Sequence, residues 1–385
     1  MVLNRYLDTI KPSGIRKLFD LAQSAKDAVN FGIGEPDFDT PKIIREAAQK
    51  AMENGITHYT PNAGFKELRE AISQKLQKDN NINASTDEII VTAGGTASLL
   101  ISLYTLINPG DEVIIPDPGF VAYENQVKLF GGIPVPFRLS EDNNFHPDIE
   151  LLKSLITPKT KAIIVNTPSN PTAAVYTKEE LEAIAEVALK NNIYIISDEL
   201  YEYILYDGRK HYSIASFPEM KRLTITINGF SKSYAMTGWR LGYIVADKEL
   251  IKAMLKFQQN SIVCANSITQ MAGITALKEA AEDVNKMLKE YTRRKEFIFK
   301  AINEIKGLSC KQIEGAFYAF VNIKDTNMSS EEVSMYLLKD YEVVTVPGNA
   351  FGKYGEGYIR LSFATSMEKI KEGTKRMKEA IESLR

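Results

Sequence analysis

The stretch Asn228-Gly229-Phe230-Ser231-Lys232-Ser233-Tyr234-Ala235-Met236-Thr237-Gly238-Trp239-Arg240-Leu241-Gly242 decides the fold of this 385-residue chain. It follows residues 223–227, whose alternating apolar and β-branched side chains predict a strand. Small residues on both sides of Lys232 leave room for a bulky group at the ammonium, and Gly242 permits close approach of the backbone. The ordinary alternative is a solvated surface turn, because solvated lysines vastly outnumber reactive ones.

The length of the match favours a functional interpretation. The stretch resembles the Schiff-base lysine segment of the class I and II aminotransferases, fold type I enzymes that use pyridoxal 5'-phosphate (PLP). The resemblance implies that Lys232 binds the PLP aldehyde and, once released, acts as general base and acid at the substrate Cα. It also places Ser231 and Arg240 among the cofactor-binding residues. The planar, permanently charged fork of Arg240 suits a phosphate ester.

Composition excludes several classes of partner. The net charge of −2 gives no argument for binding nucleic acid or an anionic membrane, and no apolar run is long enough to span a membrane. The N-terminus lacks the apolar core of a signal peptide. Cys264 and Cys310 are far apart and are expected to be buried free thiols, which favours a cytoplasmic location. His58, His146 and His211 are scattered, so we expect turn or surface positions and no metal site.

Short apolar segments separated by helical stretches predict a mostly parallel sheet that is covered on both faces. The predicted strands are 88–92, 112–116, 133–137, 162–165, 194–197, 223–228 and 243–246, followed near the C-terminus by 317–322, 343–346 and 358–363. With the resemblance, the expected fold is α/β, the PLP-transferase fold type I. It has a large domain with a mostly parallel (mixed) seven-stranded sheet between helices, and a smaller α+β domain. We expect an N-terminal arm and part of the small domain in 1–45, the PLP-binding domain in 46–284 and the small domain in 285–385.

Polar residues follow two of these strands, where parallel sheets bind ligands. Asp198 follows strand 194–197, and a carboxylate beside the pyridine nitrogen of PLP favours the protonated ring that acts as an electron sink. The resemblance implies that Asn170 and Tyr201 donate hydrogen bonds to the ring oxygen O3′. Taken alone, Asn170 is a turn residue before proline and Tyr201 a half-buried tyrosine.

A glycine-rich turn, Ala93-Gly94-Gly95-Thr96, feeds a helix predicted over 99–107. Unpaired N–H groups and the positive end of a helix dipole suit a phosphate, although such a turn alone is more often only a tight turn. It lacks the end of a Walker A loop. The resemblance places Gly95 and Thr96 at the phosphate and Phe120 against the pyridine ring. Without the resemblance, Phe120 would be assigned to the core.

Further residues are assigned by the resemblance to the substrate and to a partner subunit. Gly34, with Asn170, meets the substrate carboxylate, and the Gly32-Ile33-Gly34 run is a weak dinucleotide motif because the third glycine is missing. Arg360 grips the α-carboxylate in a bidentate pair, whereas an arginine inside a strand ordinarily faces outward. Tyr59 reaches the phosphate in the other subunit of a homodimer with shared active sites; its ordinary role is an interfacial aromatic.

The expected activity is therefore an aminotransferase. By a ping-pong mechanism it moves the amino group of an L-amino acid (aspartate, aromatic or alanine type) to 2-oxoglutarate. The donor stays open, because Thr96 stands where some relatives carry a lysine and 257–271 hold no arginine or lysine. Either Arg16 binds a distal carboxylate, or the preferred side chain is aromatic or aliphatic. A PLP-dependent β-lyase (C–S lyase) or decarboxylase would share every PLP contact.

Overall fold

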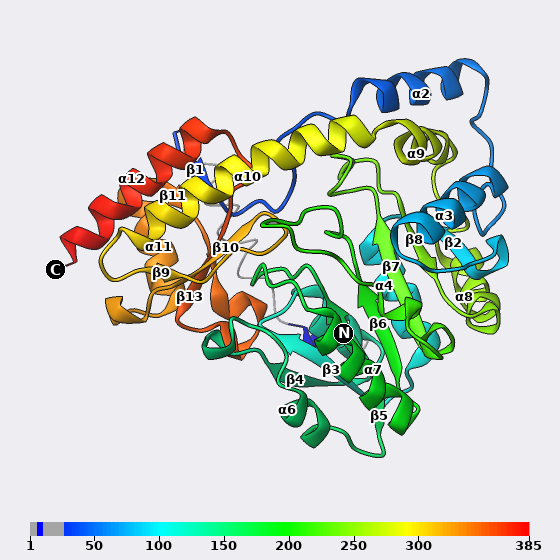
Figure 1. Ribbon diagram of the computed structural model, residues 1–385, viewed down its shortest axis with the longest axis horizontal. Helices are drawn as coiled ribbons and strands as arrows, with labels where there is room; N and C mark the ends of the chain where they lie inside the picture. Colours follow the sequence, from blue (N-terminus) through cyan, green and yellow to red (C-terminus); the bar gives the residue numbers. More distant parts are fainter. Residues whose placement is uncertain (1–5, 11–26, 385) are drawn as a thin grey trace.

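The computed structural model describes residues 6–10 and 27–384. Figure 1 shows a region around a large sheet and a C-terminal region, connected by the long helix α10 (Ala281–Asn303). Arg16, in the N-terminal arm, lies outside the described residues. Among the described helices, none is both long and apolar enough to cross a membrane.

The large sheet has seven strands in the order β2-β8-β7-β6-β5-β3-β4. Neighbouring strands are parallel except β8, which runs antiparallel to both β2 and β7. The strands are β2 (Ile89–Thr92), β3 (Glu112–Asp117), β4 (Ile133–Arg138), β5 (Thr160–Asn166), β6 (Tyr194–Asp198), β7 (Thr224–Gly229) and β8 (Gly242–Val245). The predicted mixed, mostly parallel sheet of seven strands is confirmed.

Both faces of most of this sheet are buried, which suits strands such as β2 and β5 that contain apolar runs, whereas the edge strand β4 is partly exposed. In β5, Ile163 and Val165 contact α7 residues such as Leu181, while Ala162 and Ile164 face the cluster that contains α4. The edge at β2 is covered by a third cluster. The helices of this region are α2 (Lys42–Glu53), α3 (Lys66–Asp79), α4 (Gly95–Leu106), α5 (Ala122–Leu129), α6 (Ile149–Ser154), α7 (Lys178–Asn191), α8 (Lys248–Ser261) and α9 (Ser267–Glu279).

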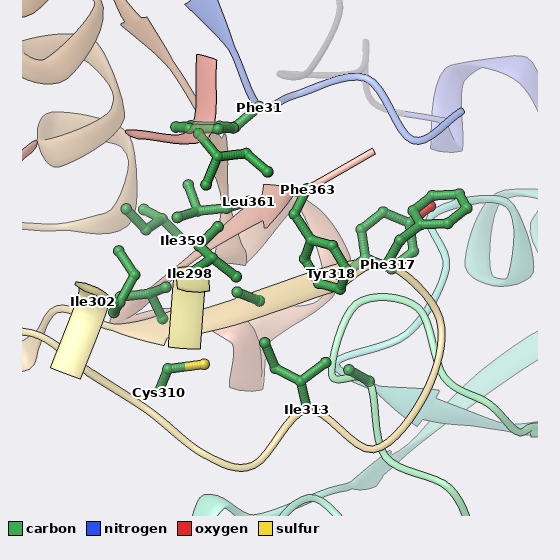
Figure 2. Packing of buried hydrophobic residues seen from close by; sticks show 14 of the residues in the cluster. Phe31, Ile298, Ile302, Cys310, Ile313, Phe317, Tyr318, Ile359, Leu361 and Phe363 are labelled. Carbon is green, nitrogen blue, oxygen red and sulfur yellow. The ribbon is translucent and has the colours of Figure 1, made fainter. Parts of the chain in front are cut away.

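The C-terminal region contains a four-stranded antiparallel sheet in the order β12-β13-β10-β9. Its elements are β9 (Ser309–Cys310), β10 (Tyr318–Asn322), α11 (Ser330–Tyr341), β12 (Val346–Pro347), β13 (Tyr358–Ser362) and α12 (Met367–Ser383). Figure 2 shows the core of this region, where Ile298 and Ile302 of α10 lie beside Ile359 and Leu361 of β13. The predicted α+β character of this part is confirmed, whereas the domain boundaries stay a prediction.

One predicted strand, 343–346, is wrong as a single element. It divides into β11 (Val343–Val344), which pairs in parallel with β1 (Val29–Asn30), and β12, which belongs to the four-stranded sheet. The chain changes sheets at Thr345, whose buried hydroxyl donates to Ser334 Oγ of α11 at 3.0 Å. The β1–β11 pair holds the N-terminal segment in the C-terminal region and leads it towards the large sheet.

Candidate active site

A cavity of ≈ 430 Å³ gathers most of the predicted site residues. Its lining includes the ends of β5 and β6, the N-terminal part of α4, the loop after β7 and the strand β13. The predicted residues that line it are Gly34, Gly95, Thr96, Phe120, Asn170, Asp198, Tyr201, Ser231, Lys232, Arg240 and Arg360. Tyr59 does not line it and is 87% exposed in the single chain, and Arg16 lies outside the described residues.

Lys232 extends into this cavity from the loop that follows β7. Its Nζ donates a hydrogen bond to the backbone oxygen of Gly34 at 2.6 Å. Burial, together with the positive charge of Arg360, lowers the pKa of Lys232 to about 8. About a tenth of the amine is therefore neutral, and nucleophilic, at pH 7, far more than for an ordinary lysine.

Asp198, the last residue of β6, is buried at the bottom of the site. Its Oδ2 accepts a hydrogen bond from the Tyr123 hydroxyl at 2.7 Å, and its Oδ1 accepts one from the Leu200 N–H at 3.3 Å. Burial raises the pKa of Asp198 to about 6, against the effect of these two bonds. A cationic ring nitrogen beside this carboxylate would favour its charged form.

Arg360 lies inward from β13 and is buried, so the expectation for an ordinary strand arginine does not apply. Its Nη1 donates to Asn170 Oδ1 at 3.1 Å and its Nη2 to the Gly32 oxygen at 2.6 Å. The guanidinium lies between two rings, 4.5 Å from the centroid of Tyr318 and 5.0 Å from that of Phe351. Its Nε is buried and has no hydrogen-bond partner among the described residues.

The helix α4 begins at Gly95, earlier than predicted, so Gly95 and Thr96 form its first turn. The chain turns into the helix at Gly94, which has φ 90°. The Nη2 atom of Arg240 lies 2.8 Å from the place that a Cβ of residue 94 would take, so only glycine leaves this space open. First-turn N–H groups have no partner within a helix. Arg240 and these groups together can bind a phosphate.

Further residues that sequence reasoning did not identify as site residues line the cavity, among them Tyr123, Asn166 and Tyr318. The hydroxyls of Tyr318 and Tyr201 are 2.7 Å apart and share a hydrogen bond. Asn166 is the last residue of β5, a position that strand-end reasoning could have selected. Its Nδ2 donates a hydrogen bond to the backbone oxygen of Asp198 at 3.1 Å. Tyr318 gives no local signal, because it lies in a strand of the other region.

We expected all three histidines at turn or surface positions, but two of them, His146 and His211, are largely buried. His146 lies between carboxylates, with Nδ1 2.9 Å from Glu180 and Nε2 2.9 Å from Glu314. His211 is largely buried, and its Nε2 lies 2.9 Å from Glu199.

The carboxylate of Glu202 lies in the same group as His211 and Glu199. This group is not an open ligand set, because the ammonium of Lys75 binds Glu202 inside it. Cys310 is buried as expected, whereas Cys264 is only partly buried; both are free.

The chain is similar to known proteins over almost its whole length. The family described as aminotransferase class I and II matches residues 26–377. An aspartate aminotransferase of Pyrococcus abyssi is 47% identical over 384 residues, covering 99% of this chain and 98% of that protein. An aromatic-amino-acid aminotransferase 2 of Thermococcus litoralis is 46% identical with the same coverage. The structure of the aspartate aminotransferase from Thermus thermophilus with maleate has a TM-score of 0.94 and 37% identity, covering 99% of this chain and 100% of that one.

Proposed function

The chain belongs to the class I and II aminotransferases, and on this premise we propose that it moves the amino group of an L-amino acid to 2-oxoglutarate in two half-reactions. Membership confirms three predictions: the PLP-transferase fold type I, the aminotransferase activity and the cofactor PLP. The proposal is carried by one observation. The amine of Lys232 and the guanidinium of Arg360 line the same cavity, which suits an amino acid with its Cα near one and its carboxylate at the other.

The residues of the cavity fit the cofactor. The buried Asp198 would hold the ring nitrogen, and Arg240 with the first turn of α4 would hold the phosphate. Asn170 and Tyr201 would donate to the ring oxygen O3′, and Phe120 would cover a face of the ring. When bound, PLP withdraws electrons from the Cα of an attached amino acid and so makes that carbon acidic.

Lys232 has two tasks in this proposal. It would hold the cofactor through the aldehyde, and its amine would be free again once the amino group of the substrate takes its place. The released amine takes the proton from the substrate Cα. A pKa of about 8 suits this task, because the amine can gain and lose a proton near neutral pH.

Arg360 would orient the substrate. Its Nη atoms are already fixed by Asn170 and Gly32, so the guanidinium is held in place before the substrate arrives. Preorganisation of this kind reduces the entropy that is lost on binding. Bonds to the α-carboxylate would then present the Cα hydrogen to Lys232.

The donor is aspartate, an aromatic amino acid or alanine. Relatives carry the names aspartate and aromatic-amino-acid aminotransferase, which supports the first two. The test is to mix the PLP-loaded protein with each L-amino acid and follow conversion of the yellow form to the pyridoxamine form. Addition of 2-oxoglutarate should restore the yellow form and yield glutamate. Release of pyruvate and ammonia without an oxo acid would instead indicate a β-lyase, and a persistently yellow protein would refute the proposal.

We also propose a homodimer with shared sites and a cytoplasmic location. The homodimer is supported by Tyr59, whose aromatic side chain is 87% exposed in the single chain. The cytoplasmic location is supported by the two free cysteines. Light scattering coupled to size exclusion tests the dimer. If Tyr59 binds the cofactor phosphate across the interface, Tyr59→Phe should weaken PLP binding without changing the mass of the particle.

A further inference from the structure

Asp117 is a buried acidic residue outside the cavity, at the carboxyl end of β3. Its Oδ2 accepts a hydrogen bond from the Lys353 N–H at 3.1 Å, and its Oδ1 accepts one from the Tyr354 N–H at 3.0 Å. Both donors belong to the 3-10 turn η8 (Lys353–Gly355), which lies between β12 and β13 of the C-terminal sheet. The carboxylate therefore joins the large sheet to the region that carries Arg360.

A second bond lies beside the first. The N–H of Gly119 donates to the Phe351 oxygen at 2.8 Å, so bonds to the segment 351–354 lie on both sides of Pro118. The segment approaches closely because residue 352 is glycine. It has φ +127°, and a Cβ there would lie 2.1 Å from Asp117 Oδ1.

The two linked segments each lead to the cavity. Phe120, directly after Gly119, lines it. On the other side, the ring of Phe351 lies 5.0 Å from the guanidinium of Arg360. The link at Asp117 thus connects the turn that carries Phe120 with the ring that covers Arg360.

The carboxylate is ionised at neutral pH although it is buried. Burial raises the pKa of Asp117 to about 6, against the two bonds from the backbone. Among the described residues, the hydrogen bonds of its carboxylate come from these two N–H groups. Burying a carboxylate without hydrogen-bond partners costs free energy. The bonds therefore favour the arrangement in which the segment 351–354 lies against the Phe120 turn.

We propose that Asp117 is a positioning residue for amino transfer, holding the segment 351–354 against the Phe120 turn and so placing Arg360 relative to the cofactor ring. This inference rests on the proposed aminotransferase function. Displacement of a substrate-positioning group by about 1 Å can cost on the order of 10²-fold in rate. Removal of the link should therefore act through the position of Arg360. Because Arg360 is proposed to bind the carboxylate of the amino donor, the KM for that donor should respond more than kcat.

The experiment compares Asp117→Ala, Asp117→Asn and Gly352→Ala with the wild-type protein and the exposed control Asp340→Ala. Asp117→Ala should lower kcat/KM by about ten- to a hundredfold, mainly through KM, and the Asn variant, which keeps one acceptor oxygen, should recover part of this loss. Gly352→Ala pushes a methyl group against the same carboxylate and should give the same KM defect. In the double variant the two defects should not add.

A second measurement does not depend on activity. In the cofactor-free protein, amide hydrogen exchange at Lys353 and Tyr354 should be faster in Asp117→Ala than in the control. An unchanged KM in both Asp117→Asn and Gly352→Ala, with normal transfer by the wild-type protein, would overturn this inference alone. Absence of transfer by the wild-type protein would overturn the proposed function and this inference with it. If Asp117→Ala does not fold, the other two variants decide the question.

Discussion

Replacement of Arg360 by leucine removes the group proposed to bind the substrate carboxylate. The guanidinium is buried and fixed by two hydrogen bonds, and its Nε has no acceptor within the described part of the chain. Leucine keeps much of the apolar contact with Tyr318 and Phe351 but supplies no donor. The variant therefore removes the charged fork, together with its bonds to Asn170 and Gly32, while it keeps part of the packing.

The size of the effect follows from the bonds that a carboxylate would make. Two charge-assisted hydrogen bonds at about 1.5–3 kcal/mol each give about 3–6 kcal/mol in total. At about 1.4 kcal/mol for each factor of ten, this predicts a loss of roughly 10²–10⁴ in kcat/KM for an amino acid.

The assay is the first half-reaction, followed as loss of the yellow form at a series of amino acid concentrations. Arg360→Lys keeps the charge but not the fork and should retain part of the activity. Arg222→Leu, at an exposed arginine, is the matched control and should behave like the wild-type protein. A donor amine without a carboxylate should react at similar rates with wild-type and Arg360→Leu proteins. Near-normal kcat/KM of Arg360→Leu with amino acids would refute the carboxylate assignment.

Three other predictions concern charges at and beyond the site. Asp198→Asn removes the anion proposed to face the ring nitrogen, and one charge-assisted bond of about 1.5–3 kcal/mol predicts roughly a 10–10²-fold lower kcat; an unchanged kcat would contradict the assignment. For His146, burial lowers the pKa but the bonds with Glu180 and Glu314 outweigh it and raise the pKa from 6.5 to about 9. The contribution of protonated His146 to the free energy of unfolding is thus complete below pH 6.5 and is lost as the pH rises through 9. Urea unfolding should show this decline in the wild-type protein and a weaker decline in His146→Gln. Lys75→Met leaves the buried Glu202 without its cation and should lower the free energy of unfolding by about 3–5 kcal/mol, a loss that adding Glu202→Gln should reduce.

Much of the fold could be predicted because its signals are local. Strand periodicity located the seven strands of the large sheet, and the residues at their carboxyl ends could be assigned to one site because parallel strands end on the same side. Asp198 is of this kind, whereas Lys232, although it follows β7, is assigned by the family resemblance. Arg360 is different, since a strand arginine ordinarily faces outward and only the family resemblance placed it inside.

The remaining features depend on contacts between distant parts of the chain. No local pattern brings Tyr318 beside Tyr201, or Asp117 beside the backbone of Lys353. The burial of His146 likewise depends on Glu314, 168 residues away. The division of 343–346 between two sheets has the same origin, because the partner strands β1 and β13 come from opposite ends of the chain.

The most direct test of the central claim is to locate the covalent bond between the cofactor and the protein. The PLP-loaded protein is reduced with borohydride, digested, and its peptides are weighed and sequenced by mass spectrometry. The account predicts that the mass of the reduced cofactor is found on Lys232, and that Lys232→Arg carries no label. A label on a different lysine, or an unlabelled Lys232 peptide in a protein saturated with PLP, would contradict it.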